Sequence, residues 1–461
     1  MKHFGFAAVI ALGLCACTAP APEAQRRASP DGSLPAMKVF AAPVVSHTRE
    51  ANPDLARDFL DLSFAMESGR AVPVLTRFEG PVSVHLTGHV PASVGPDLDK
   101  LLARLRNEAG IDISRAGGGT GGGTGGGTGG GTITVEFLSR AALQAVVPNA
   151  ACFVVPNVGS WSEFRHSRNA RRIDWAALAS REKVAVFVPN DTSPQEMRDC
   201  LHEEIAQALG PLNDLYRLPD SVFNDDNFNT ILTGFDMMML RLTYAPELRS
   251  GMSRTQVAAL LPGMLARVNP AGRGIGGGEP AMTPRVWIAM LETALGAKGN
   301  PAQRYDAAQR AVAMAQAQGW RDNRLAFSLF VLGRLSVSRD MDVAGPAFAE
   351  ARRLYLAIPG SAVHLAHVDM QLAAFALKSG DARRALSLVN ESLMPVAGSE
   401  NAALLATLLM LKSEALLQLG RASEARAVRL DSLGWARYGF GPEAEVRNRM
   451  SEIASLAPTR P

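Results

Sequence analysis

The first half of the chain alternates between two hydrophobic periodicities. Residues 54–66 place apolar side chains at helical spacing, and residues 96–109 do so again with a proline at their start. Residues 81–90 instead alternate apolar and polar positions, as a half-buried strand does. Short apolar runs predict further strands at 132–138, 152–155 and 183–188. We therefore expect an α+β domain over residues 51–255.

The second half has helical spacing throughout and is rich in Ala, Leu and Arg. Its helices break about every 40 residues, which indicates an internal repeat. The breaks fall at Gly299-Asn300, Arg339-Asp340, Gly380-Asp381 and Gly420-Arg421. Small residues recur around the last two breaks, at Ala373, Ala385, Ser413 and Ala425. This pattern resembles tetratricopeptide repeats, whose unit of about 34 residues is shorter. The resemblance implies an all-α solenoid over residues 285–461, and a plain helical bundle is the alternative.

Two glycine-rich stretches interrupt these patterns. The first is AGGGTGGGTGGGTGGGT at residues 116–132, and the second is AGRGIGGGEP at residues 271–280. Both lack the Gly-Lys-Ser/Thr ending of a phosphate-binding loop, so neither predicts a nucleotide site. We interpret the first as a loop of the α+β domain, because glycine loses the most entropy on ordering. The second marks a linker over residues 256–284.

The N-terminus has the pattern of an export signal. A positive start is followed by a short apolar run from Phe4 to Leu14, too short for a lasting transmembrane helix of roughly 20 residues. The next residues, Leu14-Cys15-Ala16-Cys17, resemble the lipobox of bacterial lipoproteins. That resemblance implies removal of residues 1–16, a lipid on Cys17 and a flexible tether over residues 17–50. Thr18, where inner-membrane lipoproteins carry aspartate, favours the outer membrane, facing the periplasm.

Export sets the expected state of the two remaining cysteines. An even pair in an oxidising compartment predicts a disulfide between Cys152 and Cys200, and two buried free thiols are the alternative. The net charge of +3 over 461 residues provides no field for gathering nucleic acid, so we expect no nucleic-acid partner.

The segment 198–214, RDCLHEEIAQALGPLND, carries the most specific motif. A metallopeptidase HExxH motif that begins at His202 fails, because Ala206 occupies the second ligand position. One residue later the chain reads Glu203-Glu204-x-x-Gln207-x-x-Gly210-x-x-Asn213. This spacing resembles the metzincin signature HExxHxxGxxH/D with every ligand position altered. The resemblance places Glu204 at the position of the general base.

The spacing of this motif has structural content. We expect a helix over residues 194–209 that presents Glu203 and Gln207 on one face. Gly210 can end that helix in a left-handed conformation and turn the chain back. Asn213 would then lie where metzincins place a third ligand.

The resemblance continues beyond the motif. Ser221 lies about where metzincins have their methionine turn, and Asp236 and Tyr244 match the spacing of the family's closing helix. Over roughly residues 55–250, the chain also resembles an uncharacterised family of exported proteobacterial proteins with this Glu-Glu-Gln signature.

The altered positions argue against a metal or any other cofactor. Zinc prefers imidazole, thiolate and then carboxylate, and two of the three positions carry neutral amides. Three oxygen ligands are also too few for a good calcium site. We expect Gln207 and Asn213 to hydrogen-bond each other and the turn, and His202 to cap or pack. The methionines Met237, Met238 and Met239 are expected in the core.

The segment from Trp161 to Trp175, WSEFRHSRNARRIDW, interleaves aromatic residues with arginines. It could form an anion- or peptide-binding rim beside a cleft, and the simpler interpretation is a solvated loop anchored by its tryptophans. Neither a Gly-x-Ser-x-Gly elbow nor a Cys–His pair with free thiols supports nucleophilic catalysis.

These patterns predict an envelope lipoprotein that acts as a protein-interaction scaffold or adaptor. Solenoids present concave surfaces, so we expect an envelope protein or peptide on the helical repeats and the membrane at the lipid of Cys17. The zincin-like domain is expected to be inactive. The alternatives are a divergent hydrolase, acting on peptides or cell-wall material with Glu204 as general base, and a purely structural envelope component.

Overall fold

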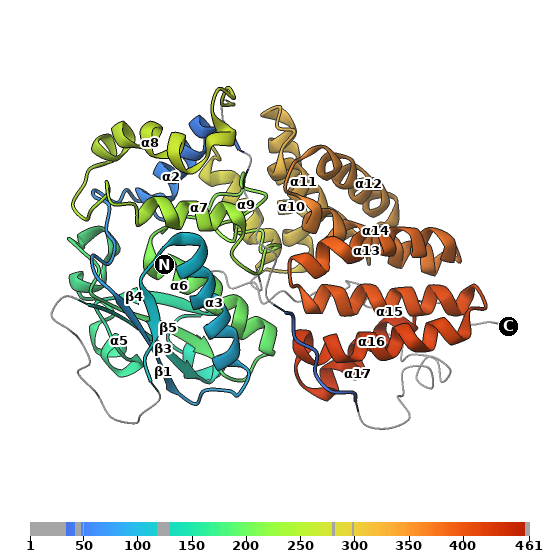
Figure 1. The fold of residues 1–461 in the computed structure, drawn as a ribbon. Coiled ribbons are helices and arrows are strands. Elements are labelled where there is room, and N and C mark those ends of the chain that lie inside the picture. The colour runs from blue at the N-terminus through green and yellow to red at the C-terminus, as the bar shows by residue number, and fades with distance from the viewer. Residues whose placement is uncertain are drawn as a thin grey trace.

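The computed structural model describes residues 34–41, 48, 50–117, 130–148, 150–278, 282–296 and 299–456. The predicted lipidation site Cys17, the predicted signal peptide and the centre of the first glycine-rich stretch lie outside these ranges. A mixed α/β part occupies the first half of the chain, and a region made only of helices follows it (Figure 1). Over the described ranges, every helix is too short or too polar to cross a membrane.

Within the described residues, five strands form one sheet in the order β2-β1-β3-β5-β4. The strands are β1 (Val82–Gly88), β2 (Ile113–Arg115), β3 (Gly131–Leu138), β4 (Phe153–Pro156) and β5 (Lys183–Pro189). All neighbouring pairs are parallel except β4 and β5, which are antiparallel. Four of these strands confirm predicted strands: β1 the alternating stretch, and β3, β4 and β5 the apolar runs. β2 is too short to produce a periodicity.

Helices cover both faces of this sheet. They are α2 (Asn52–Ser63), α3 (Val94–Ala109), α4 (Arg140–Gln144), α5 (Trp161–Ser167), α6 (Pro194–Leu209), α7 (Gly234–Thr243) and α8 (Arg254–Val268). Alternate residues of β5 enter two cores: Val184 and Val186 pack beneath α3 and α6, and Ala185 and Phe187 pack toward α5. This two-sided burial explains why β5 is a continuous apolar run rather than an alternating one.

Residues 256–268, which we expected in a linker, form most of α8. Val257, Leu261 and Leu265 recur at a spacing of four and join the core of the α/β domain, where α8 packs on α2. The α/β domain therefore continues to Val268.

The second half consists of α9 (Arg285–Leu295), α10 (Pro301–Ala317), α11 (Asn323–Ser336), α12 (Met341–Ala357), α13 (Ala362–Lys378), α14 (Ala382–Gly398), α15 (Ala402–Gln418), α16 (Ala422–Phe440) and α17 (Glu443–Ala454). All four predicted breaks fall between helices, and consecutive helices pack on each other (Figure 1). The predicted small residues lie at these contacts, where Ser413 Oγ donates to the Ala425 carbonyl at 2.9 Å.

Residues 34–41, which we expected in the flexible tether, instead bind along α16, and we call them the strap. Lys38 N donates to the Gly434 carbonyl at 3.0 Å, and Phe40 stacks on Trp435 with ring centroids 4.4 Å apart. A Cβ at Gly434 would lie 2.9 Å from Lys38 Cγ, so the glycine permits this approach. On the other side, Lys100 Nζ of α3 donates to the Phe40 carbonyl at 2.7 Å, so the strap contacts both halves.

Candidate functional site

Helix α6 spans the range expected for the motif helix. It begins after Ser193, whose Oγ accepts a hydrogen bond from Glu196 N, and Pro194 occupies its first turn. Its C-terminus is held by Arg181, whose guanidinium donates to the carbonyls of Gln207, Ala208 and Gly210 at 2.6, 2.7 and 2.6 Å. Burial lowers the pKa of Arg181 to about 10, so the group stays charged at neutral pH. The cation satisfies the orphan carbonyls and the negative end of the helix dipole.

Gly210 ends α6, but the expected left-handed conformation is wrong. Its φ is −164°, which is extended backbone. The glycine is required for close packing instead: a Cβ there would lie 3.1 Å from Thr243 Oγ1 and 3.2 Å from Thr243 Cγ2. Helix α7 thus approaches the turn of the motif directly.

The expected hydrogen bond between Gln207 and Asn213 is also wrong. Asn213 Nδ2 donates to the Asp61 carbonyl at 3.0 Å, and Leu212 N donates to the Leu62 carbonyl at 3.0 Å. The turn is drawn to α2, because the last carbonyls of that helix have no partners within the helix. The Gln207 side chain is 2% exposed, and its Nε2 has no hydrogen-bond partner among the described residues.

His202 fastens the loop that follows the motif. Leu232 N donates to His202 Nδ1 at 3.1 Å, so the imidazole packs as a buried acceptor. Burial, together with the charges of Arg198 and Arg104, lowers the pKa of His202 well below its usual range and keeps it neutral.

Ser221, Asp236 and Tyr244 connect this same loop to α6 and α7. Ser221 Oγ donates to Asp236 Oδ1 at 2.6 Å, and the Tyr244 hydroxyl donates to the Leu209 carbonyl at 3.1 Å. Asp236 also accepts from Thr233 N at 2.8 Å and so caps α7. Tyr244 thus holds the end of the motif helix, and Ser221 and Asp236 join the following loop to the start of α7.

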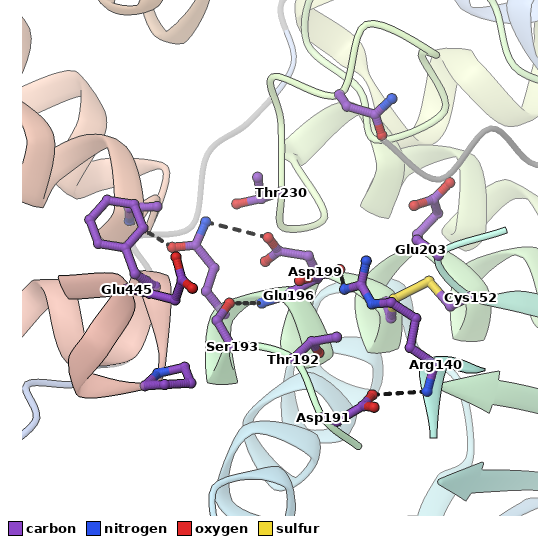
Figure 2. Close-up of a pocket in the computed structure, with 18 of the residues that line it drawn as sticks. Arg140, Cys152, Asp191, Thr192, Ser193, Glu196, Asp199, Glu203, Thr230 and Glu445 are labelled. Atoms are coloured by element: carbon purple, nitrogen blue, oxygen red, sulfur yellow. Dashed lines mark hydrogen bonds and ion pairs between the residues drawn. A yellow bond between two sulfur atoms is a disulfide. The ribbon is translucent and has the colours of Figure 1, made fainter. Parts of the chain in front are cut away.

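One face of α6 forms a wall of a 620 Å³ cavity between the α/β domain and the last helices of the second half (Figure 2). Glu196, Asp199, Cys200 and Glu203 lie on this face because their spacing of three and four matches the helical turn. Glu204 also borders the cavity and is only 1% exposed. Gln207 and Asn213 are not among the residues that line it.

The lining is strongly acidic. Among the described residues it contains two arginines, Arg140 and Arg449, against eight carboxylates. The carboxylates are Asp191, Glu196, Asp199, Glu203, Glu204, Asp225, Glu445 and Glu452. Arg140 pairs with Glu196, and Arg449 pairs with Glu452 at 2.7 Å. Carboxylates thus outnumber arginines four to one among the described lining residues.

Burial is the main influence on the carboxyl groups of this region. It raises the pKa of Asp199 to about 6, against the opposing effect of Arg198, which donates to it at 2.7 Å. Burial also raises the pKa of Asp214 well above its usual range, and the nearby carboxylates of Glu67, Asp225 and Glu203 act in the same direction. Asp214, Glu67 and Asp225 were not predicted: Asp214 directly follows the motif position Asn213 but occupies no position of the signature, and Glu67 and Asp225 come from other segments.

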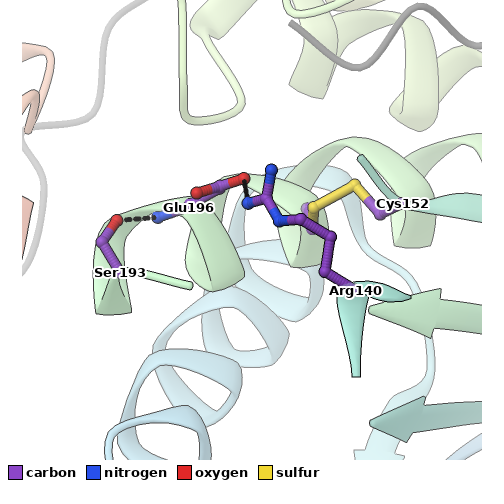
Figure 3. Close-up of a disulfide and its surroundings, with 5 residues drawn as sticks. Arg140, Cys152, Ser193 and Glu196 are labelled. Atoms are coloured by element: carbon purple, nitrogen blue, oxygen red, sulfur yellow. Dashed lines mark hydrogen bonds and ion pairs between the residues drawn. A yellow bond between two sulfur atoms is a disulfide. The ribbon is translucent and has the colours of Figure 1, made fainter. Parts of the chain in front are cut away.

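The predicted disulfide between Cys152 and Cys200 is confirmed. Its Cα atoms are 6.0 Å apart, and it links the start of β4 to the middle of α6 (Figure 3). Both cysteines line the cavity.

The segment from Trp161 to Trp175 lies outside the cavity lining described above. Trp161 packs against Phe153 and Phe187, and Trp175 is buried beneath the Arg181 guanidinium, 4.8 Å from its ring centroid. The tryptophans are thus anchors of the fold.

No group of three or more His, Cys, Asp or Glu side chains in the described ranges is arranged to hold a metal ion. The described part of the chain is therefore a mixed α/β domain with an acidic cavity, joined to an all-α region. Residues 52–263 match a family model described as "Protein of unknown function (DUF2927)", in agreement with the expected resemblance to an uncharacterised family. The match runs from α2 into α8. Neither the curated proteins nor the solved structures include a match to the chain.

Proposed function

We propose that this protein is a lipid-anchored envelope adaptor that binds a basic segment of a partner protein in its acidic cavity. The observation that carries the proposal is the composition of the cavity lining, eight carboxylates against two arginines. A low-dielectric cleft of one sign concentrates ligands of the opposite sign. Lysine or arginine side chains of an extended peptide match both the charge and the size of this space.

The α/β domain serves here as a zincin-like scaffold without hydrolytic function. The sheet order, the position of α6 and the contacts of Ser221, Asp236 and Tyr244 support the zincin resemblance. Glu203, at the first altered ligand position, lies in the cavity, whereas Asn213 is held by α2. A cleft that has lost its ligands can still bind a chain.

The α/β domain covers part of the surface of α11 and α13 that an isolated solenoid would present to a partner. Phe228 of the α/β domain packs on His367 of α13 and Phe330 of α11, with ring centroids 4.4 and 5.2 Å apart. Asn323 Nδ2 of α11 donates to the Tyr216 carbonyl at 2.7 Å. We therefore place the partner in the cavity, where α16 and α17 supply the opposite wall.

Binding of a fluorescent lysine-rich peptide to the detergent-solubilised full chain tests this proposal. We expect affinity to fall at least tenfold between low and high salt. Glu203→Gln and Asp225→Asn should each weaken binding about threefold to tenfold. Glu350→Gln is the matched control, because Glu350 pairs with Arg353 on the surface of α12. Binding should strengthen as pH rises through about 6, where Asp199 becomes charged.

Three results would count against the adaptor. Equal binding of a glutamate-rich peptide would contradict the role of the cavity charge. An unchanged affinity in both carboxylate variants would place the peptide elsewhere. Cleavage of the bound peptide that is lost in Glu204→Gln would replace the adaptor with a hydrolase.

The lipid anchor is tested separately: Cys17→Ser should release the protein from the membrane fraction, and Cys15→Ser should not.

A further inference from the structure

The Cys152–Cys200 disulfide forms part of the cavity wall, although each cysteine is almost entirely buried. The residues are 5% and 4% exposed, and both line the cavity. Small molecules that enter this space can therefore meet the disulfide without unfolding of the chain. Large protein surfaces are excluded, because both cysteines are buried residues of the cavity wall.

Charged groups surround this disulfide in a defined arrangement. Cys200 has Glu196 one turn before it and Glu203 one turn after it on α6. The Arg140 guanidinium lies between Glu196 and the disulfide in both close-ups (Figures 2 and 3). The disulfide thus has a carboxylate one helical turn away on either side along α6, and the Arg140 guanidinium pairs with one of these carboxylates.

We propose that the Cys152–Cys200 disulfide is a thiol-exchange site that accepts a small cationic aminothiol from the cavity. It shares the cavity with the proposed peptide site but does not require any peptide to bind there. The carboxylates attract the ammonium group of the entering molecule, and Arg140 stabilises the thiolate that leaves.

The exchange proceeds in two balanced steps. The thiolate of the first aminothiol attacks one sulfur and forms a mixed disulfide, and the other cysteine leaves as a thiolate that takes up a proton. A second aminothiol then attacks the mixed disulfide and releases the second cysteine thiol. Overall, two aminothiols are oxidised to their disulfide, and the Cys152–Cys200 bond is reduced by two electrons.

The charge of the lining selects among thiols of similar size. A cationic thiol is concentrated by the carboxylates, a neutral thiol is not, and an anionic thiol is repelled. Cysteamine, 2-mercaptoethanol and 2-mercaptoethanesulfonate provide this series. For each thiol, the rate of reduction of the protein disulfide is divided by the rate at which the same thiol reduces a small neutral disulfide. This normalisation removes differences in intrinsic thiol reactivity.

The experiment measures reduction of the disulfide in the folded, detergent-solubilised chain by quenched alkylation and peptide mapping of Cys152 and Cys200. We expect normalised rates at least tenfold higher for cysteamine than for mercaptoethanesulfonate at low salt, and rates proportional to thiol concentration. High salt should remove most of the difference. Equal normalised rates for all three thiols would overturn the proposal, because the lining would then not select by charge. Rates independent of thiol concentration would also overturn it, because reduction would then follow unfolding.

Arg140 variants test the leaving-group role. With neutral 2-mercaptoethanol, Arg140→Gln should slow exchange about threefold to tenfold, and Arg140→Lys should restore most of the rate. An unchanged rate in Arg140→Gln would remove Arg140 from the site.

A lysine-rich peptide should protect the disulfide only if it occupies the cavity. Charge-selective exchange without peptide binding would therefore retain this proposal while the adaptor function failed.

Discussion

The two halves of the molecule bury polar side chains for different purposes. In the α/β domain these groups hold the domain itself: Arg181 binds the end of α6, and Asp236 caps α7. In the helical half, three of them reach out of it. Asn323 and His364 bind the Tyr216 carbonyl and the Asp226 carboxylate at 2.7 and 2.9 Å, and Asn401 accepts from Gln195 of α6 at 3.1 Å.

This difference shows that the helical half is built around the α/β domain. A buried polar group is costly unless it is partnered. The partners of Asn323 Nδ2 and His364 Nε2 are supplied by the other half, and Asn401 Oδ1 accepts from Gln195 there as well as from Leu404 N of its own helix. Separation of the helical half from the α/β domain would leave these polar groups without their partners in the other half. It would also expose the aromatic rings that pack around Phe228. The inner face of the helices is therefore an internal interface of this chain.

The largest expected effect concerns the internal polar groups of the α/β domain. Arg181→Met keeps an apolar stem but leaves three carbonyls at the end of α6 without their donor. We expect a loss of about 4 kcal/mol of unfolding free energy, measured by urea denaturation. Arg165→Met on the exposed side of α5 is the control, with an expected change below about 0.5 kcal/mol. A loss below about 1 kcal/mol in Arg181→Met would contradict the assigned role.

The next prediction distinguishes a side chain between the two halves from one in the interior of the α/β domain. Phe228→Ala removes a ring that packs on α11 and α13, and Phe164→Ala removes one from the cluster under α5. Both should cost about 3 kcal/mol. Only Phe228→Ala should increase hydrogen exchange in α11 and α13. If both variants left those helices equally protected, Phe228 would not hold the halves together.

The smallest effect is a pH dependence at the same interface. Burial, with repulsion from Asp236, raises the pKa of Asp220 to about 6, against the opposing effect of His364. The folded state thus holds this proton more tightly than the unfolded state, and stability falls as pH rises from about 4 to about 6.

Asp220→Asn imitates the protonated form. We expect it to be about 1 kcal/mol more stable than the wild type at pH 7.5 and equally stable below pH 4, after allowance for partial exposure of the carboxyl group. Urea midpoints across this pH range measure the difference, and Asp112→Asn at an exposed position is the control. A constant difference at all pH values would show that the effect is not the titration of Asp220.

Much of the fold could be predicted from local patterns, because they are local in origin. The strands and α6 follow from periodicity, a serine cap and a proline, and the helix breaks follow from the glycines at positions such as Gly380 and Gly420. The insertion of Phe228 into the helical half has no such signal, because its partners are about 100 residues away or more.

The candidate site was predictable only along α6. Glu203 and Cys200 were found because helical spacing and the cysteine pair place them. Asp225 and Arg140 line the same cavity from other segments, and Asn213 lies outside the lining because its side chain donates to the Asp61 carbonyl at the end of α2. The spacing of a motif does not predict which of several possible tertiary contacts a side chain makes.

The strap on α16 has a mechanical consequence for a chain lipidated at Cys17. A tether from Cys17 to Glu50 could extend about 115 Å, whereas a tether from Cys17 to Leu34 could extend only about 60 Å. In a chain anchored at Cys17, the binding of Phe40 and Lys38 to α16 would halve the height to which the folded body could rise above the bilayer. In that anchored chain, the folded body would be attached at α16 rather than at α2.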